Sequence, residues 1–195
     1  MPESLKATRA PIPIGSIQVD GFMLPDGSYR MSRTQTAECV GLGVQNASDF
    51  LRSKAIKTLL GEGYTPQKSE RKEIEIEPEP GKRGASRFLP MSLDVVVAYW
   101  HWQSHRGNKK ALALCMALAT ESLERRFDDA FGVTRTEQER DDLLSQRLQQ
   151  LEQDLKGATD FEAAAQYELN YVRDWLKQKG LDPWELPGEE EIDSR

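Results

Sequence analysis

Residues 32–52 constrain the fold most, because Ala37 and Gly41 stand four positions apart, the usual spacing in a helix–turn–helix motif. Such a motif needs a small residue where the second helix crosses the first, and a turn residue that accepts a positive φ. Apolar residues flank the glycine, and Phe50 stands where the second helix would be anchored in a core. The segment therefore predicts two short helices joined by a tight turn, the first opened by a capping box of Ser32 and Gln35.

The polar side chains of this segment predict contact with double-stranded DNA. Amide and hydroxyl groups fall on the early part of the second helix, where they can read base edges in a major groove. These residues are Gln45, Asn46 and Ser48. Basic residues in and just after the segment are placed to bind phosphate, namely Arg33, Arg52, Lys54 and Lys57. The alternative is a structural helical hairpin whose polar face is only solvated.

Two β-hairpins are predicted around the helical segment. Residues 17–24 alternate as a strand does, a Pro-Asp-Gly turn follows, and residues 29–31 can return as the second strand. Residues 72–77 alternate glutamate with isoleucine, and residues 87–91 can pair back against them. Basic residues surround the tip of this second hairpin and form a second candidate phosphate contact, the alternative being a solvated loop. They are Lys82, Arg83 and Arg87.

Two helices are predicted after the second hairpin. The first covers residues 92–105 and is interrupted by a Gly-Asn pair. The second covers residues 109–131 and is closed by Gly132. Apolar residues at helical spacing mark the face of this second helix that we expect to be buried. They are Leu112, Cys115, Ala119, Leu123 and Phe127.

The last third of the chain is predicted to form a helical hairpin. Capping boxes that begin at Thr136 and Thr159 open helices at about 137–156 and 160–179. Each helix has an apolar face that must be covered, either by the preceding domain or by a second chain. A dimer is attractive because two-fold symmetry matches palindromic DNA sites. The first face consists of Leu144, Leu148, Leu151 and Leu155, and the second of Phe161, Ala165, Leu169, Val172 and Leu176 beside Tyr167, Tyr171 and Trp175.

Together these patterns predict an α+β fold, in which a small hairpin-containing, helix–turn–helix-like domain precedes a helical C-terminal region. Pro11 and Pro13 lack the amide hydrogens of regular structure, so the N-terminal segment is expected to be flexible. The expected divisions are a flexible arm at 1–16, a DNA-binding α+β domain at 17–135, a helical hairpin at 136–180 and an acidic tail at 181–195.

Charge is spread unevenly along the 195 residues, whose formal net charge is −6. Residues 1–135 carry 19 basic and 16 acidic side chains, which gives +3, whereas residues 136–195 carry 7 and 16, which gives −9. The acidity therefore belongs to the last third, and the segment expected to bind DNA is mildly basic. Blocks of opposite charge of this kind assign the nucleic-acid partner to the first part of the chain.

Composition also bears on the compartment. No run of 18 apolar residues is present, so no membrane span is expected, and the N-terminus lacks the apolar stretch of a secretory signal. Cys39 and Cys115 have no neighbouring cysteine partners and fit reduced thiols in a cytoplasmic protein.

Two other functions stay open. In a protein–protein interaction adaptor, the helical region would be the functional part and the turn at Gly41 would be only structural. In a metal-dependent DNA endonuclease, Glu73, Glu75 and Glu77 on one face of a strand would bind Mg²⁺. The leading interpretation requires neither a catalytic residue nor a metal or other cofactor.

The order of these pieces resembles the DNA-binding domains of phage antirepressors, the KilA-N and Bro-N group. The resemblance is carried by residues 17–29, 35–52 and 93–131. It implies DNA binding, as a regulator with a C-terminal oligomerisation region. Residues 107–132 also resemble a segment of uncharacterised cyanobacterial proteins of similar length.

Overall fold

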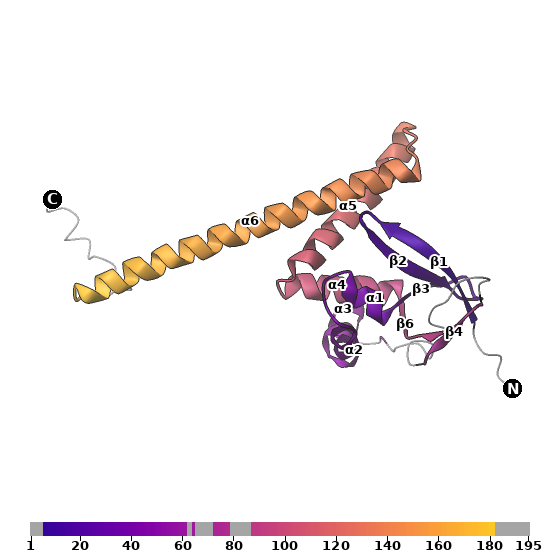
Figure 1. Cartoon of the computed structure of the whole chain (residues 1–195), viewed down its shortest axis with the longest axis horizontal. Coiled ribbons are helices and arrows are strands. Elements are labelled where there is room, and N and C mark those ends of the chain that lie inside the picture. Colours follow the sequence, from indigo (N-terminus) through magenta and orange to yellow (C-terminus); the bar gives the residue numbers. More distant parts are fainter. Residues whose placement is uncertain (1–5, 62–63, 65–71, 79–86, 182–195) are drawn as a thin grey trace. The chain divides into compact units, whose positions relative to one another are not determined.

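The structure, a computed structural model, describes residues 6–61, 64, 72–78 and 87–181, except for the side chains of residues 159–162 (Figure 1). Lys82, Arg83 and almost all of the predicted acidic tail lie outside the described residues. The chain divides into two compact units, Met1–Glu152 and Gln153–Arg195. The fold is α+β, as predicted. Among the described residues, no helix is long and apolar enough to cross a membrane.

One mixed sheet in the first unit contains the described strands in the order β5-β4-β1-β2-β3-β6. Only β1 and β4 pair in parallel. The strands β5 and β6 stand at opposite ends of this order, yet Leu89 alone separates them in the chain, so the sheet curls back on itself. The strands are β1 (Lys6–Ile14), β2 (Ile17–Met23), β3 (Tyr29–Ser32), β4 (Ile74–Ile76), β5 (Arg87–Phe88) and β6 (Pro90–Ser92).

Both predicted hairpins are present, with one change of partner. Strand β2 pairs with β3, and β4 pairs with β5 through Ile74 opposite Phe88. Residues 90 and 91, which were expected to belong to the second hairpin, instead pair with β3 as part of β6. Strand β6 leads into the helix that begins at Leu93, and β3 leads into the helix that begins at Arg33. The pairing of β3 with β6 therefore holds the starts of these two helices together.

The N-terminal segment is a strand where the sequence predicts a flexible arm. Strand β1 pairs with β2 along its length, with Pro11 opposite Asp20 and Pro13 opposite Gln18. The carbonyl of Ala7 accepts a bond from Glu77 N on the β4 side, and backbone groups of alternate residues point to the same side of a strand. Both prolines lie an even number of residues from Ala7, so their backbone nitrogens point to the same side of β1 as the Ala7 carbonyl, away from β2. Within β1, strand β4 pairs only with Lys6 and Ala7, so no described strand needs an amide hydrogen from Pro11 or Pro13 on that side.

The helices up to residue 131 agree with the predicted spans, and the last one does not. One continuous helix, α6, replaces the predicted helical hairpin. Gly157 inside it costs only about 1 kcal/mol relative to alanine, and no proline interrupts the span, so the helix continues past the second predicted cap. The described helices are α1 (Arg33–Glu38), α2 (Val44–Arg52), α3 (Ala55–Leu60), α4 (Leu93–His105), α5 (Lys109–Phe131) and α6 (Glu137–Gln178).

Two apolar clusters hold the first unit together. The larger cluster packs one face of the sheet against the helices, and it includes Phe50, Met91, Tyr99 and Leu114. The smaller cluster lies around Phe22 and Phe88, whose rings stack with centroids 3.8 Å apart. Burying aromatic side chains of this size supplies much of the driving force for folding.

Helix α5 buries a different face from the predicted one. Ala111, Leu114 and Ala117 are buried against the core, whereas Leu123 and Phe127 are 57% and 62% exposed. The helix carries two apolar faces, and small alanines allow the closer approach to α4, so packing selects the alanine face.

The start of α6 belongs to the core of the first unit. Thr136 and Glu139 form the predicted capping box, with Thr136 Oγ1 accepting from Glu139 N at 3.2 Å and Glu139 Oε2 accepting from Thr136 N at 2.7 Å. Leu144 and Leu148 are buried in the larger cluster. The first predicted apolar face is therefore covered, over these residues, by the same chain.

The two cysteines are free thiols, as predicted. Cys39 is buried just after α1, and its burial raises the pKa of the thiol to about 11. A thiol that stays protonated in an apolar site is chemically inert, so Cys39 serves packing.

Candidate nucleic-acid interface

The segment from α1 to α2 has the geometry that the sequence predicts for a helix–turn–helix. The amide of Gly41 donates to Glu38 O at 2.9 Å, and the amide of Leu42 donates to Ala37 O at 3.0 Å. This nested pair of bonds is a Schellman motif, which requires the left-handed conformation that Gly41 adopts with φ of 72°. Ala37 is completely buried, so a larger side chain there would separate the two helices.

The first helix is held to the sheet through its cap. Ser32 Oγ accepts a bond from Gln35 N at 3.1 Å, as predicted. The second half of the expected box differs, because Gln35 Oε1 accepts from Asp20 N of β2 at 3.1 Å and from the Ser32 hydroxyl. The amide side chain thereby joins α1 to the neighbouring strand and fixes the direction in which α1 leaves the sheet.

The buried face of α2 packs against α4. The Phe50 ring contacts Tyr99 edge-on at a centroid distance of 5.5 Å. Asn46 Oδ1 accepts hydrogen bonds from Tyr99 Oη at 3.0 Å and from Gln103 Nε2. Burial raises the pKa of Tyr99 to about 12, so its hydroxyl remains the donor. Asn46, which the sequence assigns to base reading, therefore has its carbonyl oxygen engaged in holding α2 against α4.

The outer face of α2 carries a small polar network. Asp49 Oδ1 accepts from Arg52 Nη2 at 2.7 Å and from Gln45 Nε2 at 2.8 Å. The bonds from Arg52 and Gln45 hold the pKa of the Asp49 carboxyl below its ordinary value. Ser48 is half-buried on the same helix. Asp49 was not predicted from the sequence, although its spacing of four from Gln45 and three from Arg52 is the signal for such pairs.

This network is compatible with contact to bases. An ion pair between exposed side chains is worth little, so a polar partner can replace it at small cost. A carboxylate can accept a bond from the exocyclic amine of cytosine, and an arginine can bind guanine. The outer face of α2 thus offers donors and an acceptor within two helical turns.

Basic side chains continue from α2 into α3. Lys54 and Lys57 are exposed, and within the described part of the chain neither forms an ion pair. Helix α3 is anchored by the buried Ile56, which directs the lysines outward. The structure thus leaves these two predicted phosphate ligands available.

Two further cations, Lys110 beside the turn and Arg106 at the end of α4, were not predicted from the sequence. Asn108 Nδ2 donates to Val40 O at 2.9 Å and fixes the α4–α5 junction against the turn. The aliphatic part of Lys110 passes 3.4 Å from where a Cβ on Gly41 would be. Arg106 lies over the Trp102 ring at 4.6 Å. The signal in the sequence is the cluster of Arg106 with two lysines at the start of α5.

Arg33 and Arg87, the other described candidates for phosphate binding, are less available. Arg33 is half-buried, and its amide donates to Leu89 O at 3.0 Å, which places the start of α1 next to the junction of β5 and β6. Arg87 forms an ion pair with Glu75 at 2.9 Å. A phosphate at Arg87 would have to compete with that carboxylate.

The strand proposed for metal binding does not present three free carboxylates. Glu75 is paired with Arg87, and Glu77 Oε2 accepts a bond from Thr8 at 3.0 Å. Among the described residues, no group of three histidine, cysteine, aspartate or glutamate side chains could hold a metal ion.

Comparison with known proteins finds no relative. No family model matches the chain, and no curated protein or solved structure is similar enough to count as a match. The resemblance to antirepressor DNA-binding domains therefore stays a prediction.

Proposed function

We propose that the protein is a sequence-specific DNA-binding regulator that inserts the outer face of α2 into a major groove. The observation that carries the proposal is the Schellman turn between α1 and α2, which leaves one polar face of α2 exposed beside two lysines that form no ion pair with any described residue. Gln45 and Ser48 would contact base edges, with Asp49 and Arg52 exchanging their mutual bond for bases. Asn46 would hold the reading helix in place.

Phosphate binding would come from the cations around this face. Lys54 and Lys57 follow α2, Lys110 lies beside the turn, and Arg106 lies over the Trp102 ring. Such contacts position a protein on the duplex without reading its sequence. Lys82, Arg83 and Arg87 would form the second phosphate contact. Arg33, whose amide donates to Leu89 O, would add a cation at the start of α1.

The proposal includes a dimer. An exposed apolar face lies on the described part of α6 after residue 162, where Tyr167, Tyr171, Leu169 and Val172 are at least half exposed. Leu144 and Leu148, by contrast, are used in the core of the first unit. A two-fold dimer through the end of α6 would present two reading helices to a palindromic site.

A salt titration tests DNA binding. Full-length protein selects its site from a random duplex pool, and the affinity is then measured by fluorescence at several salt concentrations. Lys54→Ala with Lys57→Ala should reduce the magnitude of the salt slope by about 2, because each phosphate contact contributes about 0.9. Lys156→Ala with Lys177→Ala, which removes the same charge from exposed positions of α6, is the matched control.

Specificity is tested separately. Gln45→Ala should cost about 1–3 kcal/mol for the selected site and relax the preference at one base pair. Failure of the pool to enrich any sequence, or equal slopes for the two lysine pairs, would contradict the proposal.

A protein–protein interaction adaptor is the second candidate. The exposed aromatic residues of α6, Tyr167, Tyr171 and Trp175, favour it, because such side chains are enriched in protein interfaces. It would be preferred if the protein binds no DNA and stays monomeric, since that face would then require another partner.

A further inference from the structure

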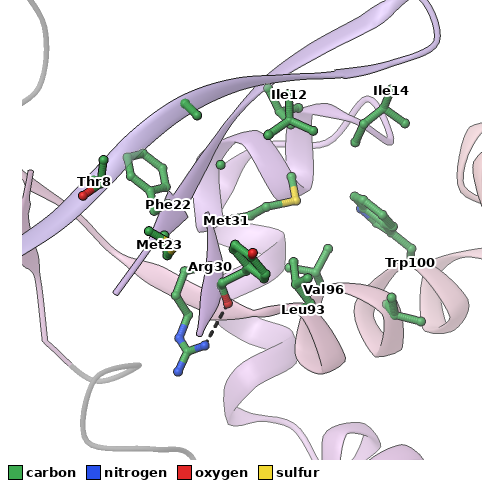
Figure 2. A pocket seen from close by; sticks show the side chains of 15 residues that line it. Thr8, Ile12, Ile14, Phe22, Met23, Arg30, Met31, Leu93, Val96 and Trp100 are labelled. Atoms are coloured by element: carbon green, nitrogen blue, oxygen red, sulfur yellow. Dashed lines mark hydrogen bonds between the residues drawn. The ribbon is translucent and has the colours of Figure 1, made fainter. Parts of the chain in front are cut away.

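A pocket of about 510 Å³ lies between the sheet and α4 (Figure 2). Ile12 and Ile14 of β1 lie on one side of it, and Leu93, Val96 and Trp100 of α4 lie on the other. Its lining is almost entirely apolar. Pockets of this size in proteins accommodate small organic molecules.

The pocket exists because small residues face each other on neighbouring strands. Ala10 of β1 stands opposite Gly21 of β2, and both line the pocket. A Cβ on Gly21 would lie 2.6 Å from Ile12 Cγ1, so the glycine is needed for Ile12 to lean across the sheet. Val19 and Val96 form the bottom of the pocket, and both are already buried without a ligand.

Large apolar side chains stand exposed around the mouth. Met23, Tyr29, Leu93 and Val97 are 44%, 60%, 46% and 48% exposed. A contiguous apolar patch of this kind on a protein surface marks a binding site more often than a solvated surface. An apolar ligand would remove these side chains from water.

A second, polar pocket adjoins the first. It has a volume of about 350 Å³ and shares Tyr29, Arg30 and Leu93 with the apolar pocket. Three charged residues line this polar pocket. Asp26 and Asp94 are exposed, whereas Arg30 is buried and donates to the Tyr29 carbonyl at 2.8 Å. Two carboxylates and one guanidinium give this pocket a net charge of −1, and the carboxylates are its more accessible charged groups.

We propose that the two pockets together bind a small amphipathic molecule, with an alkyl or aromatic body between the sheet and α4 and a cationic head group beside Asp26 and Asp94. The apolar lining matches the body, and the exposed carboxylates match the head. Hydrogen bonds from Ser28 N and Oγ to Asp26 Oδ1 fix that carboxylate at the mouth.

The same elements support the helix–turn–helix. Strand β3, which contributes Tyr29 and Met31 to the pocket, leads directly into the Ser32 cap of α1. Trp100, which lines the pocket from α4, donates from Nε1 to Thr36 O of α1 at 2.9 Å. A ligand in the pocket would thus contact elements that hold α1.

Methyl NMR of the full chain tests the proposal without DNA. Dodecylammonium, titrated below its micelle concentration, should produce saturable shifts at Ile12, Val19 and Val96. Dodecanoate should bind at least tenfold more weakly. Asp94→Asn should weaken dodecylammonium binding severalfold and leave the affinity for dodecanoate equal or higher.

A pocket-filling pair of variants localises the site. Ala10→Phe places a ring in the groove from an exposed position and should abolish saturable binding. Ala119→Phe, at an exposed alanine of α5 outside the pocket, should bind as the parent does. Unchanged Leu114 methyl signals in both variants would show that the core is intact.

Three results would overturn the proposal. The first is the absence of saturable shifts with either amphiphile, and the second is equal affinity for ammonium and carboxylate head groups. The third is a shift of the pocket methyl signals on dilution of the protein alone, which would show that a second copy of the chain occupies the groove.

Discussion

The aromatic residues of α2 and α4 differ from those of α6 in what covers them. Phe50 and Tyr99 are completely buried, whereas Tyr167 and Tyr171 are 76% and 67% exposed. Both pairs belong to apolar patterns at helical spacing. In the first case the sheet and neighbouring helices of the first unit complete the core, and in the second the described residues of the second unit leave the rings exposed.

The difference teaches that amphipathic spacing identifies a face and does not identify its partner. A covered face stabilises the monomer, and an uncovered one makes stability depend on concentration or on a partner. Mutations in the two regions should therefore differ in size and in their dependence on protein concentration.

The largest difference is expected for truncation of an aromatic ring in each region. Phe50→Ala should lower the free energy of unfolding by about 3–5 kcal/mol, because it leaves a cavity between α2 and α4. Tyr171→Ala should change it by less than about 0.5 kcal/mol at low protein concentration. Urea denaturation of both variants measures this. Equal losses at every concentration would mean that Tyr171 is buried within its own chain.

A smaller contrast is expected within α2. Asn46→Ala should cost about 2 kcal/mol, because it deprives the buried Tyr99 hydroxyl and Gln103 amide of their acceptor. Gln45→Ala removes only an exposed bond to Asp49 and should cost less than about 0.5 kcal/mol. Thermal and urea unfolding compare the two. If Gln45→Ala were the more destabilising, the assignment of Asn46 to support and Gln45 to the outer face would be wrong.

Features set by local chemistry were predicted from the sequence. Gly41 and Gly132 adopt the positive φ that their positions require, and Thr136 and Glu139 cap α6 through bonds between residues three apart. These interactions depend on a few neighbouring residues, so a short pattern contains the whole reason for them.

Features set by tertiary packing were not predicted. The sequence does not show that the free side of β1 tolerates Pro11 and Pro13, because that depends on where β4 ends. Nor does it show that α5 buries its alanines instead of Leu123, or that Asn46 faces Tyr99. The turn between α1 and α2 was thus predicted from the sequence, and the engagement of Asn46 with α4 required the structure.

A charge placed on the uncovered face of α6 should affect assembly and leave monomer stability nearly unchanged. Val172→Lys should raise the dissociation constant of the proposed dimer at least about tenfold, equal to ~1.4 kcal/mol. Gln178→Lys adds the same charge at an exposed polar position of the helix and is the matched control. Sedimentation equilibrium measures both. A parent protein that is monomeric at all concentrations would contradict the dimer.

The smallest effect is expected at the start of α6, where the two regions are joined by one helix. The hydrogen bonds from Thr136 N and then Thr136 Oγ1 hold the pKa of Glu139 below its ordinary value of 4.5. A carboxyl with a lowered pKa in the folded state stabilises it above the unfolded pKa, and this contribution is lost as the pH falls through the folded pKa. Stability should therefore decline below about pH 4.5.

Glu139→Gln separates this charge from the cap itself. Glutamine can still accept the Thr136 amide bond but cannot be protonated, so the variant should be slightly less stable than the parent at pH 7 and should lose less on acidification. Glu152→Gln, at an exposed glutamate of the same helix, should follow the parent. Urea unfolding from pH 7 to 3 measures the difference. Identical acid dependence in all three proteins would show that the cap contributes through geometry alone, and that the ionised carboxylate adds nothing to the coupling of α6 to the first unit.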